Sequence, residues 1–390
     1  MGIRPFSVEV PEADLSDLHL RLATTRWPRE EATAAPWQYG ADMGYVRDLC
    51  ASWATEFDWR SVEARINRFD NFVATVQGQD IHFLRMTGSG ERPQPLVLTH
   101  GWPGSIVEFL DVVEPLAHPE RFGGDAADGF DVIVPSLPGY GFSAPPAAPI
   151  DCREVARLWR HLLVDELGLD GFIAQGGDWG SLVTTWLGLA HADVCAGIHQ
   201  NMWIMQPHNR ADPDAEERAW LDDRRVRTRH EIAYQAIQST KFQTLSYGLT
   251  DSPAGLAAWI VEKFHGWGDI GDRTNGGDVE RRFTRQRLLE NIALYWFTGS
   301  IGPSTWMYRS IVESDNFQQP EGQRIQVPVG VARFPGDPFV MPPRQWVERM
   351  ADVVHWTEFD SGGHFAAMER PEAFVEDVRA FGRLVRAARR

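Results

Sequence analysis

Residues 174–181 read AQGGDWGS, and the glycines around Asp178 have the spacing of a displayed nucleophile. Gly176 lies two residues before Asp178, and Gly180 lies two residues after it. A strand that turns directly into a helix strains the residue at the turn, and flanking glycines leave room for that turn. The pattern therefore predicts a sharp turn that aims the Asp178 carboxylate at a ligand. The alternative is an ordinary turn in which Asp178 caps the next helix.

Two later polar residues would give Asp178 the partners that a nucleophile needs. Asp337 stands in FPGDPF after the apolar run VGVAR, and His364 stands in SGGHF after HWTEFD. Nucleophile, acid and histidine in that chain order is the order of the α/β-hydrolase triad. The acid would fix the tautomer of the imidazole, and the histidine would act as general base. Taken singly, Asp337 could be a turn aspartate and His364 a loop histidine, but together they favour a triad.

The segment HGWP, residues 100–103, follows the buried-strand pattern PLVLT and predicts a third part of the site. The backbone N–H groups of Trp102 and of Trp179, the residue after Asp178, could both point at the nucleophile. Two such donors form an oxyanion hole, which stabilises negative charge in a transition state.

A carboxylate nucleophile selects the chemistry. Its attack on an ester would give an anhydride, whereas its attack on a saturated carbon with a leaving group gives an alkyl-enzyme ester. Water activated by His364 would then hydrolyse that ester. Epoxides and alkyl halides both fit this scheme. An epoxide oxygen needs an acid such as a tyrosine, which stays protonated at neutral pH, whereas a halide needs N–H donors such as the indole of Trp179.

Four of the seven tyrosines lie in the region expected to cover the site, residues 207–310: Tyr234, Tyr247, Tyr295 and Tyr308. Tyr295, inside IALYWF, is interpreted as packing, and spacing does not rank the other three. From the residues alone, three hypotheses stay open: an epoxide hydrolase, a haloalkane dehalogenase, and a non-catalytic small-molecule binder of the same fold.

The order of apolar patterns predicts an α/β protein with a mostly parallel, doubly wound sheet. A helix is expected at 11–27, two strands around Gly78 in 72–86, a helix at 105–116 and a long helix at 152–169. Residues 207–310 show helical patterns without a convincing strand, which indicates an inserted helical cap. We expect four parts: an N-terminal helical extension (1–90), the first core part (91–206), the cap (207–310) and the second core part (311–390).

Composition excludes several classes of function. A net charge of −16 over 390 residues disfavours nucleic acid and anionic membranes as partners. No zinc-type spacing occurs, the three cysteines are far apart, and no cofactor or metal is expected. No run approaches the ~20 apolar residues of a membrane span. We expect a cytoplasmic protein that binds a small molecule and water, with a homodimer allowed.

Several long segments carry a family resemblance: PFSVEVPEADLSDLHLRLATTRWP, HGWPGSIVEF, PSLPGYGFS, GGDWGS, YQAIQSTKFQTLSYGLTDSPAGLAAWIVEKF and SGGHFAAMERP. The chain resembles the microsomal-type epoxide hydrolases nearly end to end. That resemblance implies an α/β-hydrolase fold with an N-terminal extension and hydrolysis of an epoxide to a vicinal diol. Mammalian members carry an N-terminal membrane anchor, which we do not expect here.

The resemblance also implies residue roles. Asp178 matches the nucleophile, His364 the base and Asp337 the acid that orients it. Tyr234, which opens YQAIQSTK, and Tyr308, in WMYRS, match the two tyrosines that open the epoxide. Trp102 matches the oxyanion-loop residue, and the Trp102–Pro103 peptide is expected to be cis.

Overall fold

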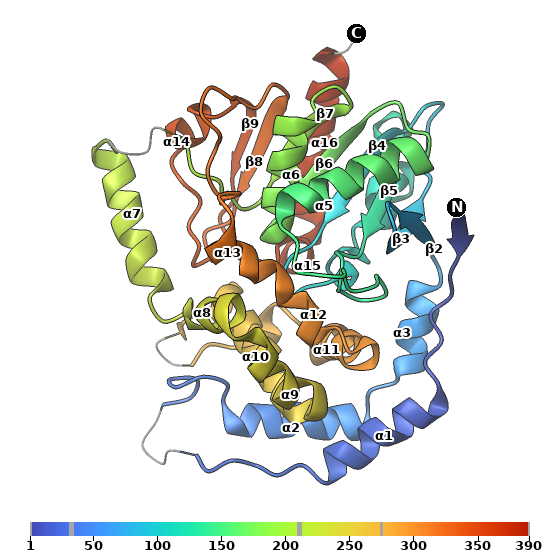
Figure 1. Ribbon diagram of the computed structural model, residues 1–390, viewed down its shortest axis with the longest axis vertical. Coiled ribbons are helices and arrows are strands. Elements are labelled where there is room, and N and C mark those ends of the chain that lie inside the picture. The colour runs from blue at the N-terminus through green and yellow to red at the C-terminus, as the bar shows by residue number, and fades with distance from the viewer. Residues whose placement is uncertain (1, 31–34, 209–212, 274–275, 389–390) are drawn as a thin grey trace.

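The computed structural model describes residues 2–30, 35–208, 213–273 and 276–388. Its described strands form one nine-stranded sheet (Figure 1). All neighbouring pairs among β4 to β9 are parallel. At one edge of the sheet, β1 pairs antiparallel with β2, β2 with β3, and β3 with β5. In spatial order they are β1 (Ile3–Pro5), β2 (Asp70–Val76), β3 (Gln79–Met86), β5 (Phe130–Pro135), β4 (Gln94–Thr99), β6 (Phe172–Gly176), β7 (Cys195–Gln200), β8 (Pro328–Arg333) and β9 (Asp352–Glu358).

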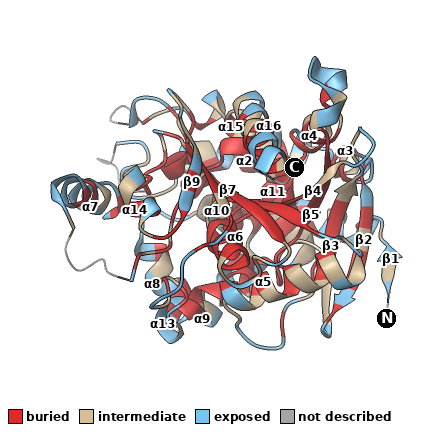
Figure 2. Cartoon of the chain, turned by 90° about the horizontal axis from the view of Figure 1, so that it is seen from above, coloured by how far each residue is buried: buried red, intermediate tan, exposed pale blue. Residues whose placement is uncertain are grey.

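Burial along the strands follows from their position in the sheet. Every residue of β5, β6 and β7 is buried, because helices cover both faces of the sheet there. The edge strand β9 mixes buried and exposed residues. Figure 2 shows the buried central strands with α5 (Cys152–Arg160) and α6 (Trp179–Ala190) on one face, and α4 (Val113–Ala117) and α16 (Pro371–Ala388) on the other.

The helices between β7 and β8 lie at one end of the sheet (Figure 1). The first two N-terminal helices lie on their far side, and the third lies beside them. The first group is α7 (Ala215–Thr228), α8 (Ala233–Thr240), α9 (Phe242–Asp251), α10 (Pro253–Trp267), α11 (Arg285–Thr298), α12 (Ile301–Ser304) and α13 (Ser310–Glu313). The second group is α1 (Glu12–Ala23), α2 (Met43–Thr55) and α3 (Trp59–Ile66). Two short helices, α14 (Arg344–Glu348) and α15 (Ala366–Glu369), follow β8 and β9.

The prediction of one continuous helix over 105–116 is wrong. The structure has a short 3-10 helix, Ile106–Phe109, and then α4. Pro115 explains the break, because proline lacks an N–H and is tolerated only in the first turn of a helix. The chain therefore starts a new helix at Val113, which places Pro115 in that first turn.

Two other expected helices end earlier or change type. The helix expected over 11–27 stops at Ala23, and the hydroxyls of Thr24 and Thr25 donate to the carbonyls of Leu20 and Leu22 in its last turn. The long helix expected over 152–169 is α-helical only to Arg160, and residues 161–166 form a π-helical turn. The strand β1 was not expected at all.

None of the helices in the described residues combines the length and apolar character needed to cross a membrane. The three cysteines, which all lie in the described part of the chain, are buried and form no disulfide. In the sheet, the carboxyl ends of β4, β6, β8 and β9 face the helices inserted between β7 and β8.

Candidate active site

Asp178 occupies a strained turn between β6 and α6, as its glycine frame predicts. Its φ of 49° and ψ of −126° lie in a region that side-chain-bearing residues rarely adopt. A Cβ on Gly180 would lie 2.0 Å from the carbonyl oxygen of Thr99, and a Cβ on Gly176 would lie 2.3 Å from the backbone of Gly180. Only glycine at both positions lets α6 start directly against β4 and β6. The alternative of a helix-capping Asp178 is wrong, because its side chain makes no capping hydrogen bond.

The side chains of Asp178, His364 and Asp337 meet beyond the ends of β6, β9 and β8. Nε2 of His364 lies 3.5 Å from Oδ2 of Asp178, and Nδ1 lies 3.1 Å from Oδ2 of Asp337. The backbone N–H of Phe339 donates to the other Asp337 oxygen at 2.9 Å. Burial lowers the pKa of His364, but the Asp337 and Asp178 carboxylates outweigh that effect and hold the pKa well above its ordinary value. The resting histidine is therefore a cation between two anions.

The loop after β4 brings backbone close to the nucleophile. The N–H of Trp102 donates to Oδ1 of Asp178 at 2.9 Å. A Cβ on Gly101 would lie 2.3 Å from the Asp178 side chain, so glycine permits this approach. The Trp102–Pro103 peptide is cis, which confirms that expectation. Trp179, the second expected donor, is the first residue of α6 directly after Asp178.

His100 holds this loop in place. Its Nε2 accepts the backbone N–H of Leu137 at 3.1 Å, so Nδ1 carries the proton and donates to the Gly101 carbonyl at 3.1 Å. Burial lowers the pKa of His100 to about 4, and the imidazole is neutral at neutral pH. The loop after β4 is thus tied to the loop after β5.

The two tyrosines singled out by the resemblance lie beside the nucleophile. Tyr234 comes from α8 and Tyr308 from the 3-10 helix Trp306–Arg309, and their ring centroids are 5.6 Å apart. The Tyr234 ring stacks on Trp102 at 5.0 Å, and the Tyr308 ring meets Trp179 edge-on at 4.7 Å. Burial raises the pKa of both phenols well above the ordinary value, so both remain O–H donors.

The other two tyrosines of this region lie elsewhere. Tyr295 is buried and donates to the carbonyl of Gly104 at 2.8 Å, which confirms its interpretation as packing. Tyr247 is 74 % exposed. Geometry therefore separates the tyrosines that spacing could not rank.

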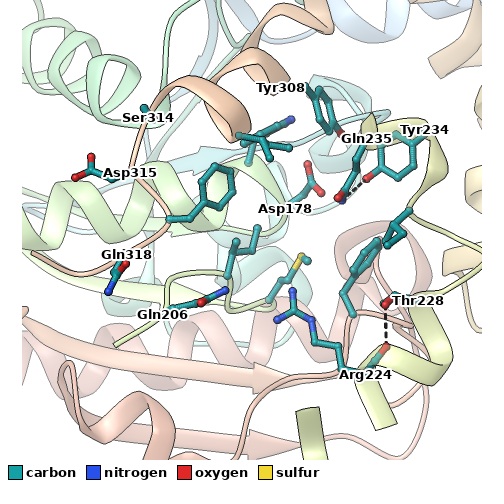
Figure 3. Close-up of a pocket in the computed structure, with 17 residues that line it drawn as sticks. Asp178, Gln206, Arg224, Thr228, Tyr234, Gln235, Tyr308, Ser314, Asp315 and Gln318 are labelled. Atoms are coloured by element: carbon teal, nitrogen blue, oxygen red, sulfur yellow. Dashed lines mark hydrogen bonds between the residues drawn. The ribbon is translucent and has the colours of Figure 1, made fainter. Parts of the chain in front are cut away.

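A cavity of about 400 Å³ opens in front of Asp178, Tyr234 and Tyr308 (Figure 3). Its wall combines apolar side chains with polar and charged ones, and a small-molecule site can use both kinds of contact. The apolar lining residues are Trp179, Met202, Ile204, Ile232, Ile311, Phe317 and Phe339.

A second, much smaller cavity of about 10 Å³ also touches Asp178, and His100, Glu108, Asn201 and His364 line it. That volume is close to the ~10–15 Å³ that one water molecule needs. Burial raises the pKa of Glu108 to about 8, with the nearby Asp178 charge adding to the effect. The carboxyl group of Glu108 is therefore mostly protonated at neutral pH.

Sequence reasoning missed Glu108, His100 and Arg224, which lines the large cavity. Glu108 and His100 belong to the HGWPGSIVEF segment, but only the fold shows that their side chains turn toward Asp178. Arg224 lies in a charge-rich stretch, ERAWLDDRRVR, where nothing in the pattern distinguishes it from its neighbours. Within the described residues, no group of three histidine, cysteine, aspartate or glutamate side chains could hold a metal ion.

Comparisons with known proteins show the family of the chain and its fold. The family model "Epoxide hydrolase N terminus" matches residues 3–109, and the model "alpha/beta hydrolase fold" matches residues 94–227. Epoxide hydrolase 1 of Oryctolagus cuniculus is 34 % identical over 417 residues, covering 98 % of this chain and 89 % of the relative.

Two solved structures resemble the molecule over nearly its full length. The epoxide hydrolase of Aspergillus niger has a TM-score of 0.84 and 31 % identity, covering 99 % of this chain and 97 % of the other. The juvenile hormone epoxide hydrolase of the silkworm Bombyx mori has a TM-score of 0.85 and 29 % identity, covering 100 % and 95 %.

The sheet order, the turn at Asp178 and the histidine in reach of it define an α/β-hydrolase. Within that class, the full-length relatives and the N-terminal match are decisive. The chain belongs to the epoxide hydrolase family, whose members are hydrolases of ether bonds.

Proposed function

We propose that this protein converts an epoxide and water to a vicinal diol through a covalent ester on Asp178. The observation that carries this mechanism is the arrangement around one carboxylate. Trp102 N–H holds Oδ1 of Asp178, His364 stands 3.5 Å from Oδ2, and two protonated tyrosines border the same cavity.

In the first step, Oδ2 of Asp178 attacks an epoxide carbon and the ring C–O bond breaks. The epoxide oxygen takes a proton from Tyr234 or Tyr308, and solvent later restores that proton to the tyrosine. Asp178 becomes a neutral ester. Loss of its charge removes one of the two anions that raise the pKa of His364, so the imidazole releases its proton to solvent and becomes a base.

In the second step, water loses a proton to His364 as its oxygen attacks the carbonyl carbon of the ester. Negative charge develops on Oδ1, which the N–H groups of Trp102 and Trp179 would stabilise. The acyl C–O bond then breaks, and the departing alkoxide takes the proton back from His364. The carboxylic acid left on Asp178 passes its proton to His364, which restores the resting carboxylate and imidazolium. The small cavity beside Glu108 suits the attacking water, because it touches both Asp178 and His364.

The division of the chain expected from its sequence remains a proposal that fits this mechanism. Residues 207–310 would form the cap, between core parts 91–206 and 311–390, with 1–90 as the N-terminal extension. The support is that α8 and the helix Trp306–Arg309 bring both tyrosines to the nucleophile from that region. A cytoplasmic location likewise remains a proposal.

A second candidate, haloalkane dehalogenation, is favoured by one observation. The indole nitrogens of Trp102 and Trp179 are buried without a hydrogen-bond partner in the described residues, and such N–H groups suit a halide. The paired tyrosines suit an epoxide oxygen instead. Parallel assays of diol formation and halide release, with styrene oxide and a bromoalkane, separate the two activities.

Trapping the ester tests the mechanism. In His364→Gln the first step still runs, but the second lacks its base, so the protein should gain the mass of one substrate on the peptide that contains Asp178. Asp178→Ala should form neither adduct nor diol while keeping its unfolding curve. In wild type, one turnover in heavy-oxygen water should label the Asp178 side chain rather than the first diol; label found directly in that diol would contradict the covalent ester.

A further inference from the structure

Arg224 places a positive charge on the wall of the large cavity. It is the one cationic side chain among the described residues that line that cavity. Figure 3 shows its guanidinium pointing from α7 into the pocket, with Asp178 between it and the two tyrosines in that view. A charge that faces the substrate space bears on which substrates the enzyme takes.

Position on α7 explains why Arg224 points inward. Trp220, Arg224 and Thr228 are spaced four residues apart and therefore share one helix face. Trp220 and Thr228 are buried, whereas Asp222, Asp223 and Arg225 are exposed. The Thr228 hydroxyl donates to the Arg224 carbonyl at 2.8 Å.

The helix itself is fixed to the core, so the arginine is held in place. The indole N–H of Trp220 donates to the Val340 carbonyl at 2.8 Å, and its ring meets Trp346 at 5.0 Å. Glu217 pairs with Arg349 at 2.6 Å. These contacts join α7 to the segment that follows Asp337.

Arg224 lacks a carboxylate partner of its own within the described residues. Burial lowers the pKa of its guanidinium, and the more distant Asp337 opposes this only in part. Besides Asp178, the acidic residue at the cavity wall is Asp315. Its side chain is mostly exposed and pairs with Arg153 at 3.2 Å. A partly buried guanidinium without an ion pair costs solvation energy, which an anionic ligand would recover.

The rest of the wall defines what accompanies that anion. The wall that Asp178 and Arg224 share also includes apolar side chains such as Met202 and Phe339, and the volume of about 400 Å³ suits a short chain. We propose that Arg224 binds the carboxylate of an epoxy acid, whose apolar chain joins the carboxylate to the epoxide at Asp178. This inference rests on the proposed function and names its substrate class.

Matched substrates test the proposal. Each ω-epoxy acid of about six to eleven carbons is compared with its primary amide, which has the same size without the charge. In wild type, kcat/KM should favour the acid by roughly tenfold or more, mainly through KM, and the preference should shrink between about 20 and 500 mM NaCl. In Arg224→Met the ratio of acid to amide should fall to about one, and Arg224→Lys should keep part of it.

Arg225→Met is the control, because Arg225 lies next in sequence with 78 % of its side chain exposed, and it should keep the wild-type ratio. Equal kcat/KM for acid and amide in wild type, or an unchanged ratio in Arg224→Met, would overturn the proposal. If Arg224 acts only through Asp337, Arg224→Met should lower kcat/KM for the acid and for the amide by the same factor, and the ratio between them should not change.

Calorimetry separates this inference from the proposed function. The diol acid should bind wild type more tightly than the diol amide, and Arg224→Met should erase that difference without any turnover being needed. If the diol acid binds in this way but no epoxide is hydrolysed, the proposed function fails and the carboxylate site stands. If epoxides are hydrolysed without the charge preference, the carboxylate site alone fails.

Discussion

At the scale of single residues, the site depends on where protons rest before the reaction. His364 is protonated between two carboxylates, whereas Glu108, Tyr234 and Tyr308 are neutral because they are buried. The negative charge of Asp178 thus faces the substrate, and the positive charge of His364 lies behind it. Any further ionisation near Asp178 and His364 changes the pKa of His364, which decides whether the imidazole can act as a base.

Glu108 is the residue that would upset that balance at alkaline pH. Its pKa of about 8 means that the carboxyl is protonated below that pH and ionises above it. An ionised Glu108 would keep His364 protonated and slow hydrolysis of the ester. We therefore expect kcat to fall as pH rises through about 8, and this limb to be absent in Glu108→Gln.

The measurement is kcat between about pH 6 and 10 for both proteins, with adduct level read by mass spectrometry at the alkaline end. The tyrosines would not produce this limb, since burial raises their pKa values well above the ordinary one. A limb of the same shape in Glu108→Gln would show that another group titrates.

At the scale of elements, the turn between β6 and α6 sets the geometry. Replacing Gly180 by alanine would push a Cβ to within 2.0 Å of the Thr99 carbonyl oxygen, which is backbone and has no room to give. We expect Gly180→Ala to lower the free energy of unfolding by about 1–3 kcal/mol or more and to lose activity, as measured by urea unfolding and diol assay.

Gly248 in α9 gives a matched control. A Cβ there meets nothing within 4 Å, and the glycine lies inside a helix. Gly248→Ala should therefore raise stability by about 0.5–1 kcal/mol. Similar losses in both variants would mean that glycine is not specifically required at the turn.

The same elements indicate how far the sequence alone reaches. The turn at Asp178 and the strands β4 to β9 could be predicted, since glycine spacing and short apolar runs are local signals. The break inside 105–116 was not predicted, because the apolar residues keep a helical spacing across it and Pro115 was not taken as the end of a helix. Tyr234 and Tyr308 needed the family resemblance, because their approach to Asp178 depends on how separate helices pack.

At the scale of the whole molecule, the N-terminal part of the chain contacts α10 and α11, which belong to the same group of helices as those that carry Tyr234 and Tyr308. Arg65 of α3 pairs with Glu290 of α11 at 2.6 Å and with Asp111 of the core at 2.7 Å, and Arg287 also bonds to both acids. On the other side, the ring of Trp37 stacks on His265 of α10 at 3.9 Å. Three parts of the chain that are far apart in sequence are thus joined around one buried carboxylate.

That joint predicts a stability effect with a defined pH dependence. Burial raises the pKa of Glu290, and Arg65 opposes the shift, so Arg65→Met should raise that pKa further. A carboxyl group whose pKa is higher in the folded state than in the unfolded state lowers the free energy of unfolding at pH values above its unfolded-state pKa. This loss of stability disappears as the pH falls and the group is protonated in both states. We expect a loss of about 1–3 kcal/mol that is larger at about pH 8 than at about pH 5.

Urea unfolding at both pH values measures this loss, and limited proteolysis reports whether cleavage sites in α7–α13 become accessible. Arg92→Met removes an exposed arginine from the loop before β4 and should change neither result. If Arg65→Met loses stability equally at both pH values, packing by the arginine stem, rather than its charge beside Glu290, joins the N-terminal helices to α11. If it loses none, Arg287 alone suffices to compensate the buried carboxylate.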